Sequence, residues 1–285
     1  MQFKPFYNLD PNPKYISEFV AAPYDVMTVQ QAHDFIDLHP HSVLNITRPD
    51  GANRQLEYAK EALQQSLENN MLQESNTKAF YIYELKTNTH TQTGITGCVS
   101  CQDYVDDVIF THEETRQNKV DERLKLMKIT SCQTEPVILT YDSDNLNTLF
   151  DEIKTNTAPT FTCKLDDVEH SVWKVINTNH INKIEEFFNN IDRCYIADGH
   201  HRSQASTDLY LEDKRNAKTA YYIATLFPIN SLQVFEYEMQ DGTPCAGKLL
   251  DTKQALGIRG VKGNKRAKST CFYPKLASGL FMRGI

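Results

Sequence analysis

The stretch Cys194-Tyr195-Ile196-Ala197-Asp198-Gly199-His200-His201-Arg202 decides how this chain is interpreted. Its first four residues form a short apolar run typical of a buried strand, and residues 203–211 continue with a helical pattern. Asp198 and Gly199 therefore lie at a strand-to-helix junction, where a glycine lets the backbone turn sharply and lets a ligand approach closely. We expect a binding site here, because the free N–H groups and partial positive charge of a helix N-terminus attract anions.

Each polar residue of this junction adds a group that suits a phosphate. Arg202 carries a fixed fork of donors for phosphate oxygens, and His200 and His201 add ring donors or a charge that responds near neutral pH. Asp198, at the end of a strand, would hold magnesium or accept a proton. Two alternatives stay open: a zinc site made by His200, His201 and a distant acid, and a polar turn with a structural role only.

Length and composition indicate an ordinary globular protein. The chain has 285 residues, of which 40% are hydrophobic and 24% charged, enough for one large or two small domains with a sizeable core. No window holds the roughly 20 apolar residues of a membrane helix, and the N-terminus lacks the apolar core of a signal peptide. We expect a cytoplasmic protein with reduced cysteines. Cys98 and Cys101 have C-x-x-C spacing, but without a second pair we interpret them as structural.

Stretches with helical and with alternating periodicity follow one another in mixed order. The helix expected at 28–39 has Thr28 as its N-cap. Strands expected at 79–85 and 93–104 are joined by a short connection and favour an antiparallel pair. This mixture predicts an α+β domain, with a mixed sheet and flanking helices, rather than a doubly wound sheet. The other expected elements are helices at 52–70, 119–129, 146–153 and 182–188, and strands at 136–141, 171–176, 220–227 and 232–237.

The composition changes after residue 240. Residues 241–285 carry nine Lys or Arg against two acids, and seven of the eleven glycines, although the net charge of the chain is −7. No sustained period runs through residues 238–285, and such a segment does not readily offset its ordering entropy. We expect a basic Gly/Lys-rich tail that is either a nucleic-acid arm or, our preferred interpretation, a foreign or frame-shifted end. The domain boundary is therefore expected at residue 237.

Two other segments contain polar candidates. His112 and Glu113 follow the strand-like run 108–110, and the helix after them has early carboxylates that favour its positive end. Nearer the N-terminus, Asp25 and Arg48 lie beside turn-forming prolines. Taken alone, these residues are typical of a solvated helix start and of loops.

In their order and separations these segments resemble the DUF1015 family, a domain of unknown function. The Tyr-Ile-Ala-Asp-Gly-His-His-Arg motif of the family is matched in full by residues 195–202. Departures are Ala22 in place of a proline and Ser203 in place of a tyrosine, and the pattern stops at Glu238. The resemblance covers about residues 1–237 and implies a truncated or frame-shifted member. The other matching segments are Ala21 to Val26, His112 to Thr115, Glu122 to Leu124, Leu226 to Pro228 and Leu232 to Tyr237.

The Asp-Gly-His-His-Arg element is also similar to the phosphate-binding loop of free serine kinases with a ParB/sulfiredoxin-like fold. This resemblance implies a ParB/sulfiredoxin-like core around the loop. It also implies an acidic residue elsewhere that activates the serine hydroxyl, for which Glu113 and Asp25 are the candidates. Nucleotide and metal binding would fall to Asp198, Gly199, His200, His201 and Arg202.

The leading hypothesis is a phosphotransferase that acts on a small hydroxylated metabolite such as free L-serine, with ATP or ADP and Mg²⁺. Asp198 would orient the metal, and Arg202, the imidazoles and the helix N-terminus would stabilise the transferred phosphoryl group. Glu113 would accept the hydroxyl proton. One alternative is a ParB-like nucleotide-binding or partner-binding module without metabolite turnover, and the other is a metal-dependent hydrolase using His112, His200 and His201. The acidic balance of the first 240 residues argues against nucleic acid as a partner, and no membrane partner is expected.

Overall fold

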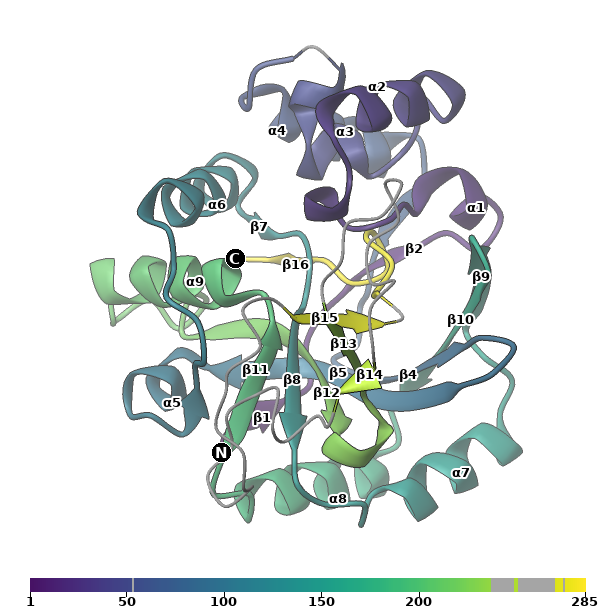
Figure 1. Ribbon diagram of the computed structural model, residues 1–285, viewed down its shortest axis with the longest axis vertical. Coiled ribbons are helices and arrows are strands. Elements are labelled where there is room, and N and C mark those ends of the chain that lie inside the picture. Colours follow the sequence, from purple (N-terminus) through teal and green to yellow (C-terminus); the bar gives the residue numbers. More distant parts are fainter. Residues whose placement is uncertain (53, 237–248, 251–269, 274) are drawn as a thin grey trace.

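A central mixed β-sheet with helices around it forms the body of the protein, as Figure 1 shows. The computed structural model describes residues 1–52, 54–236, 249–250, 270–273 and 275–285. The expected α+β class with a mixed sheet and flanking helices is confirmed. The helices are α1 (Ile16–Phe19), α2 (Val29–Leu38), α3 (Leu44–Thr47), α4 (Tyr58–Glu68), α5 (Cys101–Val105), α6 (Gln117–Thr130), α7 (Asn147–Asn156), α8 (Thr178–Asn189) and α9 (His200–Glu212), with 3-10 turns η1 (Tyr24–Val26), η2 (Pro49–Ala52) and η3 (Ile229–Ser231).

Within the described residues the large sheet has the strand order β6-β11-β8-β12-β5-β4-β10-β9, and β1 pairs beside β5. Strand β11 runs antiparallel to β8, so that Asp198 at the end of β11 lies opposite Ile138 near the start of β8. This register brings the strand-to-helix junction next to residues 135–136, which precede β8. The strands are β1 (Phe3–Lys4), β2 (Leu9–Pro11), β3 (Leu72–Glu74), β4 (Phe80–Lys86), β5 (Thr91–Ser100), β6 (Ile109–Phe110), β7 (Cys132–Gln133), β8 (Val137–Tyr141), β9 (Phe161–Leu165), β10 (Val168–Val175), β11 (Cys194–Asp198), β12 (Tyr221–Pro228), β13 (Gln233–Glu236), β14 (Leu249–Leu250), β15 (Thr270–Tyr273) and β16 (Arg283–Gly284).

Both faces of the large sheet are covered by apolar layers. On one face α7 and α8 bury Phe150 and Phe188 against the strands. On the other face the C-terminal residues pack with Phe281 against Tyr81 and Tyr83 of β4. Burying large apolar side chains on both faces is the main stabilising contribution in such an architecture.

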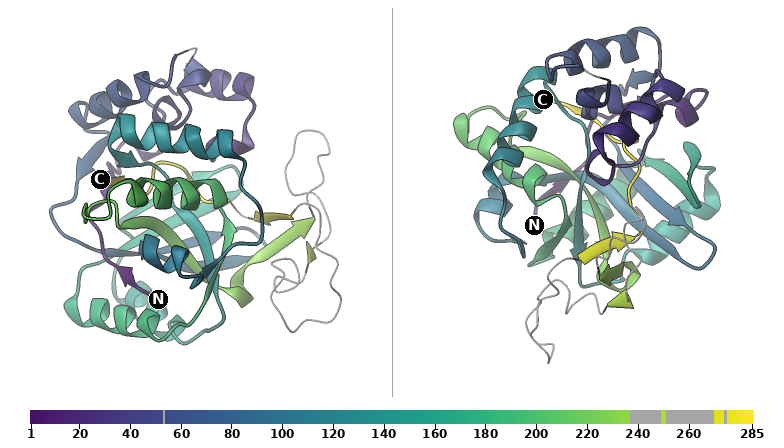
Figure 2. Two further views of the ribbon diagram at one scale, coloured as in Figure 1. Left: turned by 90° about the vertical axis from the view of Figure 1, so that its left-hand side faces the viewer. Right: turned by 45° about the horizontal axis from the view of Figure 1, so that its top comes forward.

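A smaller helical unit near the N-terminus packs above the sheet. Helices α2, α3 and α4 bury Ile36, Leu44 and Leu63 in one cluster, which also contains Met282 from the C-terminal segment. The two views of Figure 2 show the yellow C-terminal segment running between these helices and the sheet. Thr28 caps α2 through a reciprocal capping box with Gln31, as its N-cap position predicts.

Most expected elements are present, and several of their boundaries need correction, including the starts of α8 at Thr178 and of β10 at Val168. The strand expected at 93–104 ends at Ser100, because the Ser100 side chain accepts a hydrogen bond from the Gln102 N–H and caps α5 instead. The helix expected at 52–70 begins only at Tyr58, after η2 and a turn in which the Arg54 N–H donates to the Pro49 carbonyl. The helix expected at 203 already begins at His200. The antiparallel pairing of β4 with β5 is confirmed.

Residues 275–285 pack into the body of the protein. Leu276, Leu280 and Phe281 are buried, and β16 pairs antiparallel with β7. Residues 237–248 and 251–269 lie outside the described residues, so the expected basic tail is described only in part, and the boundary at residue 237 stays a prediction. No helix in the described part of the chain is long and apolar enough to cross a membrane.

Candidate functional site

The junction between β11 and α9 has a backbone that requires glycine. Gly199 has φ = 96°, in the left-handed region, and serves as the N-cap of α9. A Cβ added to Gly199 would lie 3.1 Å from Arg202 Nε, so the arginine side chain folds back closely over the glycine. The helix therefore begins directly after Asp198 and Gly199, and His200, His201 and Arg202 occupy its first turn.

Four charged side chains meet on one side of this junction, and we call them the ion-pair cluster: Glu135, Asp198, Arg202 and Lys275. Arg202 Nη2 donates to Asp198 Oδ2 at 3.0 Å, and Lys275 Nζ lies 3.9 Å from Asp198 Oδ1. Arg202 Nη1 donates to the Pro136 carbonyl at 2.7 Å and lies 4.0 Å from Glu135 Oε2. Glu135 in turn accepts a hydrogen bond from Ser278 Oγ. The cluster thus joins the junction, the start of β8 and the C-terminal segment.

The cations of this cluster keep Asp198 ionised. Burial alone would raise the pKa of Asp198, but the charges of Lys275 and Arg202 outweigh it and hold the pKa below its usual value. Asp198 is therefore a carboxylate at neutral pH. Two acids and two bases balance one another, so an added phosphate has to be accompanied by a cation or has to displace a carboxylate from its partners.

A pocket opens beside the ion-pair cluster. Pro23, from the Ala-Pro-Tyr-Asp-Val segment, lies on its wall together with all four charged residues of the cluster. The walls therefore come from the N-terminal unit, the start of β8, the junction and the C-terminal segment. We call this the phosphate pocket, after the ligand that the sequence leads us to expect at this junction.

On the other side of the junction lies a histidine cluster made of His112, Glu113, His200 and His201. The His112 and His200 rings meet edge to face with centroids 4.5 Å apart. Glu113 Oε2 lies 3.8 Å from His200 Nδ1, and Glu113 Oε1 lies 3.9 Å from His112 Nε2. His201 Nε2 accepts a hydrogen bond from the Arg116 N–H at 3.1 Å. The structure thus brings Glu113 next to the histidines and not to the wall of the phosphate pocket.

The histidines of α9 are neutral near pH 7. Burial, followed by the proximity of His112, lowers the pKa of His200 to about 3. Burial also lowers the pKa of His201. The sequence left two roles open for these histidines, hydrogen-bonding groups or a charge that responds near neutral pH, and the lowered pKa of His200 favours the first. Both rings act as hydrogen-bonding groups.

The residues of the junction suit magnesium better than zinc. In the described part of the chain there is no group of three or more His, Cys, Asp or Glu side chains that would hold a metal ion, and His201 Nε2 already accepts from the Arg116 N–H. A zinc site from His112, His200 and His201 therefore lacks the ligand set that zinc requires. Magnesium is held with one or two carboxylates, waters and substrate phosphates, and Asp198 fits that pattern.

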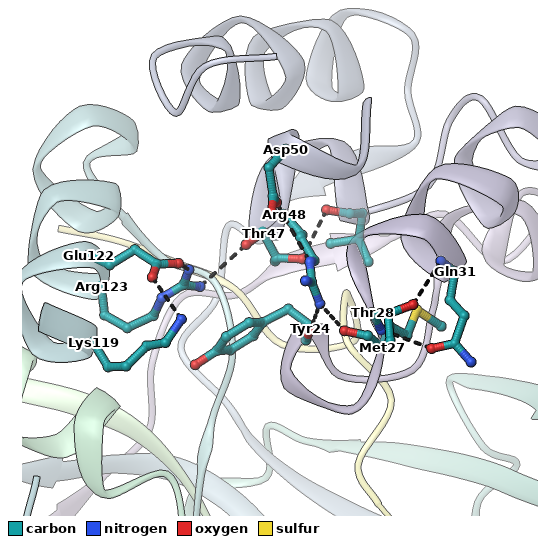
Figure 3. Close-up of polar contacts among 11 residues, drawn as sticks. Tyr24, Met27, Thr28, Gln31, Thr47, Arg48, Asp50, Lys119, Glu122 and Arg123 are labelled. Atoms are coloured by element: carbon teal, nitrogen blue, oxygen red, sulfur yellow. Dashed lines mark hydrogen bonds and ion pairs between the residues drawn. The ribbon is translucent and has the colours of Figure 1, made fainter. Parts of the chain in front are cut away.

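A network of arginines connects the N-terminal segments to the rest of the site (Figure 3). Arg48 Nη1 donates to the Tyr24 carbonyl at 2.5 Å and also to the Met27 carbonyl. Arg123 Nη1 of α6 donates to the Thr47 carbonyl at 3.3 Å, and its guanidinium lies 4.0 Å from the centre of the Tyr24 ring. These contacts fix the turn that carries Pro23. Asp25 lies in η1, but its side chain lies outside what the structure describes, so its suggested role stays a prediction.

Sequence reasoning missed two members of the ion-pair cluster. Glu135 had a usable signal, because it precedes Pro136 at the start of a predicted strand, and a residue before proline is held extended. A buried acid at that strand end lies beside the end of the antiparallel neighbour. Lys275 had no usable signal, since it falls in the segment expected to be a tail.

The comparisons with known proteins identify the family. The sequence matches the family described as "Protein of unknown function (DUF1015)" over residues 3–238. The chain belongs to this family. No curated protein and no solved structure matched the chain. In this DUF1015 protein, three of the segments on which the sequence resemblance rested, residues 21–26, 122–124 and 195–202, are brought together around the ion-pair cluster and the arginine network.

Proposed function

We propose that this DUF1015 protein is a nucleotide-dependent phosphotransferase that acts on a small hydroxylated metabolite such as free L-serine. The observation that carries the proposal is the ion-pair cluster, three of whose members, Asp198, Arg202 and Lys275, line one pocket at the N-terminus of α9. ATP or ADP would be the phosphoryl donor. We also propose that β11, Gly199 and α9 correspond to the phosphate-binding loop of ParB/sulfiredoxin-like kinases, on the strength of their matching residues.

The chemistry of phosphoryl transfer supports this assignment. Such reactions need positioning and charge stabilisation more than covalent catalysis. The Arg202 guanidinium, the Lys275 ammonium and the N–H groups of the first turn of α9 offer three kinds of donor to phosphate oxygens. Neutral His200 and His201 add no charge, so the positive groups of the site are the arginine and the lysine.

Magnesium fits the same site. Asp198 is the residue that would hold it, because its pKa is kept low and its carboxylate lies on the wall of the pocket. When bound, the ion would neutralise charge on the phosphates. Asp198 would then be shared between the metal and Arg202. The added positive charge of the ion would compensate the negative charge of the phosphate, which the neutral cluster alone does not.

The test is isothermal titration of the full chain with ADP and with ATP, with and without Mg²⁺. We expect micromolar binding that depends on Mg²⁺, and a loss of at least tenfold in affinity in Arg202→Lys, which keeps the charge and removes the fork of donors. Arg202→Ala should lose more. Arg215→Ala is the matched control, since this arginine lies just beyond the end of α9 and its side chain is 93% exposed.

Circular dichroism and thermal melts establish that each variant is folded before its affinity is interpreted. Absence of nucleotide binding by the folded wild-type protein would overturn the proposed function. Equal nucleotide affinity in wild type and Arg202→Lys would overturn the role of the arginine fork while leaving a nucleotide site elsewhere.

A further inference from the structure

A second pocket lies next to the phosphate pocket, and Arg202 lines both. It is formed between α6, α9 and β12, opens to solvent and has a cavity volume of about 30 Å³. Arg123, Glu135 and Arg202 supply its charged walls, and Leu126, Val137 and Ile223 supply apolar ones. Glu135 and Arg202 line both pockets, so the two spaces share a charged wall.

Arg123 is held in a fixed orientation at this second pocket. Its side chain is 7% exposed. It donates hydrogen bonds to the Thr47 carbonyl and to Glu122, and its guanidinium lies over the Tyr24 ring. These contacts occupy only part of the planar fork of N–H donors that a guanidinium carries. A buried guanidinium with remaining donors on a pocket wall is suited to a carboxylate, which it binds through paired hydrogen bonds.

We propose that this second pocket is the acceptor subsite and that it takes a small hydroxy acid, a molecule with one carboxylate and one hydroxyl. Arg123 binds the carboxylate. Glu135 receives the hydroxyl proton, because it lies on the wall between the acceptor subsite and the phosphate pocket. The inference rests on the proposed function for its reaction but makes a separate claim about binding. It also assigns the base to Glu135 rather than to Glu113, which is half exposed and lies among the histidines.

The transfer step balances with the groups named. The acceptor hydroxyl oxygen forms a bond to the terminal phosphorus of the nucleotide, and the bond between that phosphorus and the bridging oxygen breaks. The hydroxyl proton passes to the Glu135 carboxylate, and the shortened nucleotide leaves with the electron pair of the broken bond. Arg202 lines both pockets and is therefore positioned to bind the phosphoryl group on either side of the transfer.

The binding claim is tested by titrating the full chain with L-serine and with glycolate. Ethanolamine, which lacks the carboxylate, and L-alanine, which lacks the hydroxyl, serve as comparison ligands. We expect the hydroxy acids to bind at least tenfold more tightly than either comparison ligand. We expect Arg123→Lys to weaken them at least tenfold while the affinity for ADP changes less than twofold. Arg193→Lys is the matched control, an arginine that lies against Phe110 outside both pockets.

The outcomes separate this inference from the proposed function. If ADP binds and neither hydroxy acid binds, the acceptor subsite is wrong and the phosphotransferase proposal stands. If a hydroxy acid binds and neither nucleotide does, the subsite stands and the proposed function fails. Hydroxy-acid affinity that is equal in wild type and in folded Arg123→Lys overturns the role of Arg123.

The role of Glu135 as the base is tested with Glu135→Gln, which keeps the size of the side chain and removes its ability to accept a proton. With ATP, Mg²⁺ and L-serine or glycolate, we expect the rate of phosphorylated product, followed by ³¹P NMR, to fall at least 100-fold. Both ligand affinities should stay within threefold. Glu135→Asp should recover part of the rate, which a loss of folding alone would not permit. An unchanged rate in Glu135→Gln, or no product from wild type with both ligands bound, overturns the assignment.

Discussion

The two sides of the β11–α9 junction differ in charge. The ion-pair cluster consists of ionised groups in contact with one another, and it lines a pocket. The histidine cluster contains one carboxylate, Glu113, and the rings of His200 and His201, whose pKa values burial lowers, and it contacts the backbone between β6 and α6. Residues adjacent in sequence thus have different partners: Asp198 and Arg202 form ion pairs, and His200 and His201 accept hydrogen bonds from backbone N–H groups.

This difference divides the Asp-Gly-His-His-Arg element into two parts with different contacts. His200 Nε2 accepts from the His112 N–H at 3.5 Å, and His201 Nε2 accepts from the Arg116 N–H at 3.1 Å. The histidines therefore hold the segment 112–116 against α9. Asp198 and Arg202 carry the charges that a phosphate and its metal would meet. Changes on the ion-pair side should alter binding first, and changes on the histidine side should alter stability first.

The largest effect is expected for Asp198→Asn, which keeps the shape of the side chain and removes its charge. Phosphoryl transfer should fall about 100-fold, equivalent to about 2.7 kcal/mol in activation free energy, because the carboxylate that would hold magnesium is lost. In the absence of Mg²⁺, ADP should bind several-fold more tightly than to wild type, since Arg202 and Lys275 no longer share their charge with a carboxylate. Titrations with and without Mg²⁺ measure both changes.

Asp213→Asn is the control for this substitution, because Asp213 lies at the other end of α9 in an exposed pair with Arg215. If ADP binding to Asp198→Asn keeps the Mg²⁺ dependence of wild type, the ion-pair cluster is not the part of the junction that binds the metal. That result would place the metal away from the junction.

The next largest effect is expected for Gly199→Ala. The residue has φ = 96° and the added Cβ would lie 3.1 Å from Arg202 Nε, so the substitution strains the backbone and pushes the arginine aside. The free energy of unfolding should fall by about 1–2 kcal/mol, and ADP affinity should fall about tenfold. Urea unfolding and calorimetric titration measure the two quantities. Gly284→Ala is the matched control, since a Cβ there meets no atom within 4 Å; an equal response of the two variants would contradict the prediction.

Much of the fold could be predicted from periodicity and caps. The strands β4 and β8 could be predicted from their apolar stretches, because their side chains pack into a sheet buried on both faces. The start of α2 could be predicted from Thr28, which caps the helix. The strand continued too far at Ser100, because a serine that caps a helix has no distinct signal within an alternating run. Short strands such as β1 and β3 were not predicted, since two or three residues cannot display a period.

The site could be predicted only where its residues are consecutive. Asp198, Gly199 and Arg202 share one junction, and local chemistry was enough to propose an anion there. Glu135 and Lys275 reach the same pocket through the register of β11 with β8 and through the packing of the C-terminal segment. Both are long-range arrangements, and no local pattern encodes them.

An effect confined to stability is expected from the histidines as the pH falls. Burial lowers the pKa of His200 to about 3 and that of His170 to about 4. When the pH falls below the ordinary pKa of histidine, these two side chains bind protons in the unfolded chain but stay unprotonated in the folded protein. Stability is therefore complete above pH 6.5 and is lost as the pH falls toward 4, by up to about 1.4 kcal/mol per pH unit for each group.

Urea unfolding of wild type, His200→Gln and His170→Gln at pH 6.5, 5.5 and 4.5 measures this slope. Each variant should be less stable than wild type at pH 6.5 and should show a shallower slope. His200→Gln should also bind ADP within threefold of wild type. A tenfold loss of ADP affinity in that variant would show that His200 takes part in nucleotide binding and does not have a structural role only.

The smallest effect is expected for Lys275→Met, which tests whether the C-terminal segment belongs to the ion-pair side. Lys275 Nζ lies 3.9 Å from Asp198 Oδ1, and the lysine side chain is 22% exposed, so solvent weakens the pairing and the free energy of unfolding should change by less than about 1 kcal/mol. ADP affinity should fall about threefold to fivefold, since one of two cations facing the phosphate is lost while the Arg202 fork remains. Lys183→Met, an exposed lysine of α8 on the far face of the sheet, is the control. If nucleotide affinity is unchanged in Lys275→Met but lowered in Arg202→Lys, only the β11–α9 junction contacts the phosphate. The C-terminal segment then contributes to the protein through the packing of Phe281 and not through nucleotide binding.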